Sequence, residues 1–87
     1  MRYRAMPGVI FVSVCESLFL VTADEIIRIN EMTALCWEKL KKGTDVDELV
    51  TMATENYEVA DIKSLREDII NLLESLVSRG LVVRFDL

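Results

Sequence analysis

The sequence predicts a small α+β domain in which a three-stranded antiparallel sheet is followed by three helices. Residues 9–29 are runs of β-branched and aromatic side chains that short polar pairs interrupt, which is typical of short strands. From Asn30 onward the apolar residues instead recur at the helical period of about 3.6. The 87 residues are 52% hydrophobic, which excludes intrinsic disorder and suits one small core. We therefore expect a single domain over residues 1–87.

Three short strands are expected within residues 9–29. The turn signal Pro7-Gly8 precedes the first, and the pairs Cys-Glu at 15–16 and Asp-Glu at 24–25 separate the runs VIFVSV, SLFLVTA and IIRI. The first two runs are apolar on both alternations. This pattern is typical of a sheet that is covered on both faces or that uses one face for binding.

A first helix is expected between Asn30, a favourable N-cap, and Gly43, placed where a glycine commonly ends a helix. Trp37 lies one step off its apolar stripe, and we interpret it as a core anchor rather than a binding aromatic. Cys15 and Cys36 are far apart and form no CxxC motif, so we expect two buried, reduced thiols.

Two further helices follow. Thr44 is the expected N-cap of the second, with Asp47 at the third position of a weak capping box. The third helix is expected from about Asp61 to Arg79, ending at Gly80. Its apolar stripe is wider than the roughly 100° that a one-sided surface helix needs, so it should border something besides the core. Residues 81–83 indicate a short terminal strand or a tail that closes the core.

This order of elements supplies the parts of a winged helix-turn-helix domain, a fold that often binds DNA. The formal net charge of −5 makes nucleic acid an unfavourable partner, because binding to phosphates relies on Lys and Arg. The expected third helix is itself net negative. We expect no nucleic-acid binding, and keep a winged-helix DNA-binding regulator as an alternative.

The sequence contains no residue pattern that indicates a catalytic site. There is no histidine, so the commonest general base and metal ligand are both missing. The three glycines are too widely separated for a phosphate-binding loop. We expect no enzyme activity, no cofactor and no metal. The N-terminus has no apolar signal-peptide region and no run is long enough to span a membrane, so we expect a soluble, cytoplasmic protein without a membrane partner.

Protein or peptide binding suits the sequence better. The third expected strand is short and has tight connections, so it is a candidate edge strand with unpaired backbone groups. Such an edge can accept a peptide as an additional strand, with pockets beside it that select side chains. A docking subunit of an enzyme complex, which would use the same apolar surface, is a further alternative.

The ordered set of residues resembles the PqqD family of small peptide chaperones and leader-recognition domains, also called RiPP recognition elements. The elements that carry the resemblance extend over most of the chain and are Ile29-Asn30, Thr33-Ala34, Trp37-Glu38, Gly43-Thr44, Glu48-Leu49, Tyr57, Asp68-Ile69, Leu76 and Gly80-Leu81-Val82. Residues 21–28 lack the Pro-Glu-Arg-like stretch of pyrroloquinoline quinone chaperones, so the pathway stays open.

The resemblance implies a non-catalytic chaperone that captures the leader of a ribosomally synthesised precursor peptide by strand addition. It then presents the leader to a maturation enzyme, often a radical SAM protein. The implied strand contacts are Glu25, Ile26, Ile27, Arg28 and Ile29. The helix contacts, chosen partly by helical spacing, are Arg66, Ile69, Ile70, Leu73 and Val77. Asp68 matches the helix aspartate of the family, and we expect it to order the fold or to fix an arginine or a backbone N–H. Monomer and homodimer both stay open.

Overall fold

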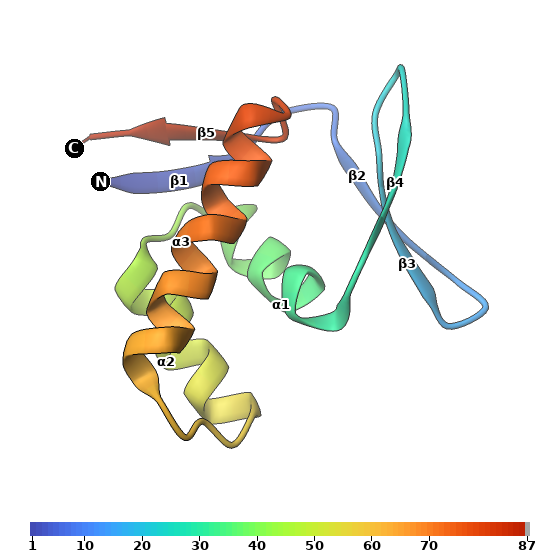
Figure 1. Cartoon of the computed structure of the whole chain (residues 1–87). Helices are drawn as coiled ribbons and strands as arrows, with labels where there is room; N and C mark the ends of the chain where they lie inside the picture. Colours follow the sequence, from blue (N-terminus) through green and yellow to red (C-terminus); the bar gives the residue numbers. More distant parts are fainter. Residues whose placement is uncertain (87) are drawn as a thin grey trace.

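The computed structural model describes residues 1–86, in which five strands and three helices follow one another (Figure 1). The elements are β1 (Arg2–Ala5), β2 (Ile10–Val14), β3 (Ser17–Val21), β4 (Ile26–Ile29), α1 (Glu31–Leu40), α2 (Val46–Asn56), α3 (Ile62–Ser78) and β5 (Val82–Phe85). Strands β2, β3 and β4 form an antiparallel sheet in that order. The predicted α+β class, with a three-stranded sheet before three helices, is confirmed.

The register of this sheet aligns the side chains of neighbouring strands in rows. Leu20 of β3 lies between Phe11 of β2 and Ile27 of β4, and the next row is Val12, Phe19 and Arg28. Successive side chains of a strand point to opposite faces, so these two rows lie on opposite faces. Leu20 is fully buried, whereas the neighbouring row is only partly covered.

A second, two-stranded sheet was not predicted in full. Strand β5 pairs antiparallel with β1, an element that the sequence analysis missed. Tyr3 of β1 is buried, and its backbone N–H donates to the Thr44 carbonyl at 2.7 Å while the Thr44 N–H donates back at 2.9 Å. The N-terminal segment therefore ties the α1–α2 loop to the end of the chain.

The predicted N-cap of α2 is wrong by one residue. The backbone of Thr44 is engaged with β1, so Asp45 takes the cap position and its carboxylate accepts from the Glu48 N–H at 2.8 Å. The other two helix starts agree with the sequence, since Asn30 caps α1 and Asp61 caps α3.

The core lies between the helices and the inner faces of both sheets. Trp37 is 1% exposed, which confirms its interpretation as a core anchor. Cys36 is buried beside it, but the prediction of two buried thiols is wrong for Cys15, which is exposed in the β2–β3 turn. Cys15 and Glu16 form a two-residue turn with φ of 48° and 67°, and such a turn directs its side chains outward.

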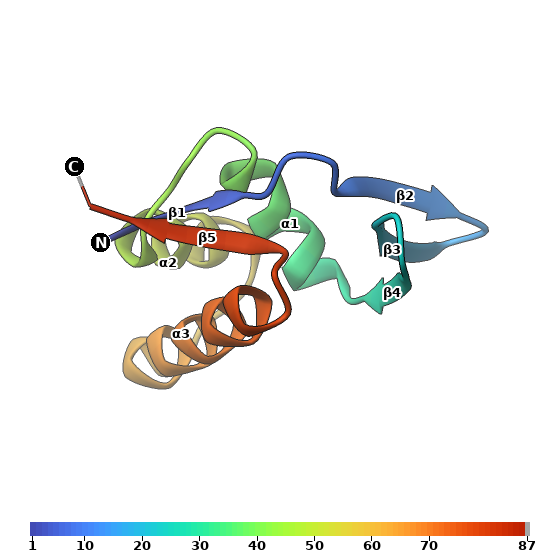
Figure 2. The same ribbon diagram turned by 90° about the horizontal axis from the view of Figure 1, so that it is seen from above.

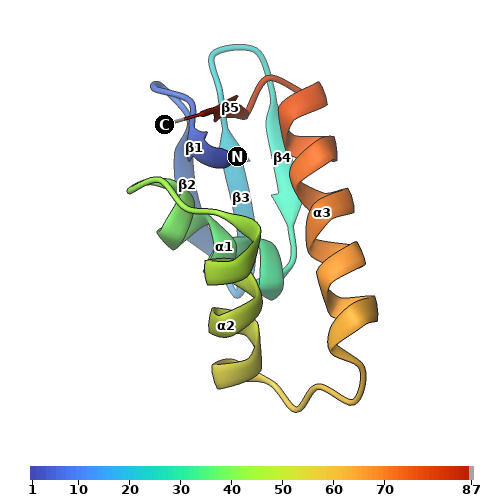
Figure 3. The same ribbon diagram turned by 90° about the vertical axis from the view of Figure 1, so that its left-hand side faces the viewer.

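The three-stranded sheet stands at one end of the molecule, beside α1 and away from the β1–β5 pair (Figure 2). Strand β4 is the edge strand nearest α3, and the two elements run in opposite directions (Figure 3). None of the helices in residues 1–86 is both long and apolar enough to cross a membrane.

Candidate functional site

Strand β4 has one open edge. In the hairpin that joins β3 to β4, the Thr22 N–H donates to the Glu25 carbonyl at 2.9 Å, so these residues face each other as a hydrogen-bonded pair. Pairing alternates along an antiparallel ladder, so the backbone groups of Ile27 and Ile29 point to β3. Those of Ile26 and Arg28 point away from the sheet.

No other backbone group in residues 1–86 bonds to these outward-pointing groups. The side chain of Ile26 is 71% exposed, and that of Arg28 is also exposed. Two residues of β4 thus present free N–H and C=O groups in the spacing that an added strand requires.

Helix α3 meets β4 at both ends of the strand. At the start of β4, the Glu25 carboxylate lies 3.5 Å from the guanidinium of Arg79, which follows the last turn of α3. At the other end, Asn30 and residues between Leu65 and Leu72 of α3 line a common pocket. The open edge of β4 therefore runs along α3 from a charged contact to a pocket.

This pocket, which we call the Asn30 pocket, has a volume of about 260 Å³. It is lined by Asn30, Met32, Thr33, Leu65, Asp68, Ile69 and Leu72. The α3 side is largely apolar, whereas Asp68 adds an exposed carboxylate. The expectation that Asp68 fixes an arginine or a backbone N–H is wrong, since within residues 1–86 it makes neither contact. The pocket can take an apolar side chain and offer a hydrogen-bond acceptor at its wall.

The predicted helix contacts are distributed over different sides of α3. Ile69 lines the Asn30 pocket, and Leu73 is fully buried in the core. Arg66 is turned to α2, where its guanidinium lies 2.6 Å from the Asp47 carboxylate. Ile70 and Val77 lie within about 40° of Arg66 at 100° per residue, on the side away from β4.

Four residues of α3 and its C-cap lie near the two ends of β4: Leu65, Asp68 and Leu72 line the pocket with Asn30, and Arg79 contacts Glu25. We call this the β4-facing side of α3. The sequence analysis assigned none of them to the binding surface, although it named Asp68 for another role. On a helical wheel they occupy about 60° on the other side of the buried residue Ile69. The wide apolar stripe indicated a second contact surface on α3, but it did not show which side faces the strand.

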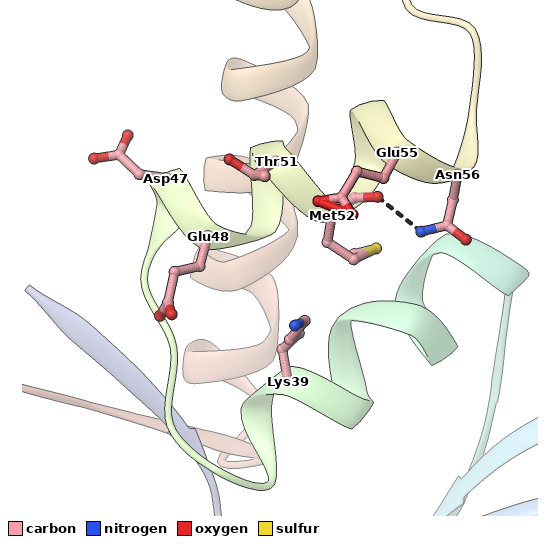
Figure 4. Close-up of a pocket in the computed structure, with 7 residues that line it drawn as sticks. All are labelled: Lys39, Asp47, Glu48, Thr51, Met52, Glu55 and Asn56. Carbon is pink, nitrogen blue, oxygen red and sulfur yellow. Dashed lines mark hydrogen bonds between the residues drawn. The ribbon is translucent and has the colours of Figure 1, made fainter.

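A larger pocket lies elsewhere, between α1 and α2 (Figure 4). Its volume is about 510 Å³, and its lining includes Lys39 of α1 and the carboxylates Asp47, Glu48 and Glu55 of α2. It shares no residue with the β4 edge. Within residues 1–86 no group of three or more Cys, Asp or Glu side chains is arranged to hold a metal ion.

Two side chains near α1, Cys36 and Tyr57, have raised pKa values. Burial raises the pKa of the Cys36 thiol to about 11, so at neutral pH this thiol is protonated and inert. Desolvation also raises the pKa of Tyr57. Its hydroxyl donates to the Glu31 carboxylate at 3.2 Å, and this hydrogen bond raises the pKa further. Both groups are therefore neutral at pH 7.

Comparison with known proteins identifies the group to which these features belong. Residues 18–82 match the family described as coenzyme PQQ synthesis protein D, PqqD. The chain belongs to the PqqD family. The matched residues extend from β3 into β5, so this PqqD-family segment contains the whole of β4, the Asn30 pocket and α3.

A solved structure shares the fold of this PqqD-family chain. It is described as lasso peptide synthetase B1 complexed with the leader peptide, and it matches with a TM-score of 0.78 and 23% sequence identity. The match covers 94% of this chain and 98% of that one, so the shared fold extends beyond residues 18–82. No curated protein matches the sequence.

Proposed function

We propose that this chain is a non-catalytic peptide chaperone that captures the leader of a ribosomally synthesised precursor peptide. The leader adds as a strand to β4, and the chain presents it to the enzyme that modifies the precursor. The family resemblance implies a radical SAM protein as one class of such an enzyme. The chain itself supplies binding and orientation and takes no part in the chemistry.

The observation that carries this proposal is the open edge of β4. Ile26 and Arg28 direct their backbone N–H and C=O groups away from the sheet, and nothing else in residues 1–86 bonds to them. An extended peptide beside β4 would satisfy these groups, and its alternate side chains would point toward α3. Affinity would then come from the main chain and selectivity from the helix.

In this proposal, the Asn30 pocket selects the leader side chains that can bind. Leu65, Ile69 and Leu72 offer apolar contacts to one leader side chain that enters beside the end of β4. The Asp68 carboxylate at the wall favours a leader residue with a hydrogen-bond donor or a positive charge next to that position. A leader with one apolar anchor beside a donor-bearing residue would match this arrangement.

The comparisons support the same function. The family is named for coenzyme PQQ synthesis, and the structural relative is described as lasso peptide synthetase B1 complexed with the leader peptide. Both names refer to biosynthesis, and the second includes a bound leader peptide. A chain of this fold with an open edge strand is suited to the same kind of ligand.

The test compares two substitutions at Arg28. Arg28→Pro removes the outward-pointing N–H but no hydrogen bond to β3, and proline is tolerated on an edge strand. Arg28→Ala removes the same side chain and keeps the N–H. The leader of the precursor encoded beside the chain is titrated into each folded variant, and amide shifts of the ¹⁵N-labelled protein are followed.

We expect Arg28→Pro to weaken leader binding at least tenfold more than Arg28→Ala, since only the proline removes a main-chain hydrogen bond to the peptide. In the wild-type chain the shifted amides should gather on β4 and on the β4-facing side of α3. Equal affinities of the two variants would contradict strand addition at β4. A wild-type chain that does not bind the leader would contradict the proposed function.

A further inference from the structure

The three-stranded sheet has an apolar outer face, turned away from the core. By the register and the alternation of side chains, it carries Ile10, Val12, Val14, Phe19, Val21 and Ile26. Ile10, Val14 and Ile26 are 60%, 51% and 71% exposed. The one charged residue on this face is Arg28. We call this surface the outer face.

Nothing in residues 1–86 covers the outer face. The apolar residues that pack against the buried core include Phe11, Ile27 and Ile29 from the inner face of the same sheet, and none from the outer face. Arg28 forms no ion pair or side-chain hydrogen bond within these residues, although every other arginine except Arg4 has an acidic partner. A contiguous apolar surface around an unpaired arginine is typical of a protein interface.

We propose that the outer face is the docking site for the enzyme that modifies the precursor peptide. The enzyme would place apolar side chains on Val12, Phe19 and Val21 and a carboxylate against Arg28. This proposal rests on the proposed function, because it adds the partner that receives the captured leader.

Continuity with the peptide edge favours this partner. Ile26 and Arg28 point their side chains to the outer face and their backbone groups to the open edge of β4. A leader strand at β4 would therefore extend the sheet by one strand, and half of its side chains would join the outer face. A protein docked there would contact the chain and the leader together, so it would recognise the loaded complex.

Size and charge argue against a second copy of this chain as the occupant. Three strands about 4.8 Å apart and five residues long at about 3.3 Å each give a face of roughly 200–250 Å². A stable interface needs about 800 Å² from each partner, so two copies joined through this face alone would fall short, whereas an enzyme that also contacts the bound leader strand beside β4 would bury a larger area. Two copies would also bring two Arg28 side chains to the interface, and the outer face offers no carboxylate to either.

The experiment uses two substitutions on β2, the strand farthest from the peptide edge. Val14→Glu and Ile10→Glu each place a charge at an exposed position of the outer face. Ser13→Glu is the matched control, because Ser13 is exposed on the same strand and points to the opposite face. For each folded variant, calorimetry measures leader affinity first. The affinity of the leader-loaded chain for the modifying enzyme encoded beside it is measured second.

We expect both outer-face variants to bind the enzyme at least tenfold more weakly than Ser13→Glu, while all three bind the leader within twofold of wild type. Normal leader binding with unchanged enzyme affinity in the outer-face variants would overturn this proposal alone. A wild-type chain that binds the leader but not the enzyme would overturn it too. So would a wild-type dimer at micromolar concentration that Val14→Glu converts to a monomer. Absence of leader binding by the wild-type chain would instead refute the proposed function, and this inference with it.

Discussion

The Glu25 carboxylate lies 3.5 Å from the Arg79 guanidinium, so the start of β4 is joined to the end of α3 by an ion pair. Glu25 is the last residue before β4, and Arg79 is the C-cap of α3. Both side chains are about half exposed, so the pair contributes about 0–1 kcal/mol to folding. Its importance is geometric, because it lies where the end of the helix meets the start of the open edge.

Breaking this ion pair should weaken peptide capture more than it weakens the fold. We expect Arg79→Ala to lower the free energy of unfolding by less than about 1 kcal/mol and to raise the leader Kd about two- to fivefold. The charge-exchanged double variant Glu25→Arg/Arg79→Glu should recover most of the affinity. Glu74→Ala, which breaks the Glu74–Arg84 pair on another side of α3, is the control and should leave leader binding unchanged.

The two sides of α3 should differ in their effect on leader affinity. We expect Leu72→Ala, in the Asn30 pocket, to weaken leader binding about tenfold, because a buried apolar contact is worth about 1–2 kcal/mol. Ile70→Ala, on the side away from β4, should leave the affinity within twofold. Isothermal titration calorimetry measures the leader affinity of both variants. A larger loss for Ile70→Ala would place the leader on the α2 side of the helix.

Local signals in the sequence were sufficient for most of the fold. Asn30 and Asp61 were recognised as helix starts because a side-chain cap acts over three residues, and the β2–β4 meander because its turns join neighbours in the chain. Strand β1 was missed because its sequence RYRA contains no apolar run and its partner β5 lies near the other end of the chain. The same distant pairing engages Thr44, which is why the α2 cap was misplaced by one residue.

For the candidate site as well, only the part that depends on local features of the sequence was predicted. The open edge strand was predicted from its short length and tight connections, which are local features. The β4-facing side of α3 was not, because the helix is apolar on both flanks of Ile69 and Leu73. The rotation of α3 is set by the burial of Ile69, Leu73 and Leu76 against elements that are distant in the chain, and this packing cannot be read from spacing within the helix.

Substitutions in the β2–β3 turn should stabilise the fold. Cys15 and Glu16 both have positive φ, a conformation that costs most residues about 1 kcal/mol and suits Asn-Gly. We expect Cys15→Asn/Glu16→Gly to raise the free energy of unfolding by about 1 kcal/mol and the thermal midpoint by several degrees. Ala23→Gly is the control, because Ala23 in the other hairpin does not have a positive φ, and it should destabilise the chain. A double variant less stable than wild type would contradict the turn geometry.

The buried Cys36 thiol should make the fold sensitive to alkaline pH. Its pKa is about 11 in the folded chain and 9.0 when unperturbed, because burial disfavours the thiolate. The folded state therefore keeps the proton longer than the unfolded state does. The stability associated with this group is complete below pH 9 and is lost as the pH rises from 9 to 11. At about 1.4 kcal/mol per pH unit, the loss is at most about 3 kcal/mol.

Urea unfolding at pH 8 and at pH 10.5 measures this loss. We expect the free energy of unfolding to fall more between the two values for the wild-type chain than for Cys36→Ala, which has no thiol to titrate in the core. Only the pH-dependent difference is compared, because the cavity left by the alanine lowers stability at both pH values alike. Cys15→Ala removes the exposed thiol and should retain the wild-type pH dependence. Equal pH dependence in all three proteins would mean that Cys36 is not the group responsible, and that water reaches its thiol in the folded state.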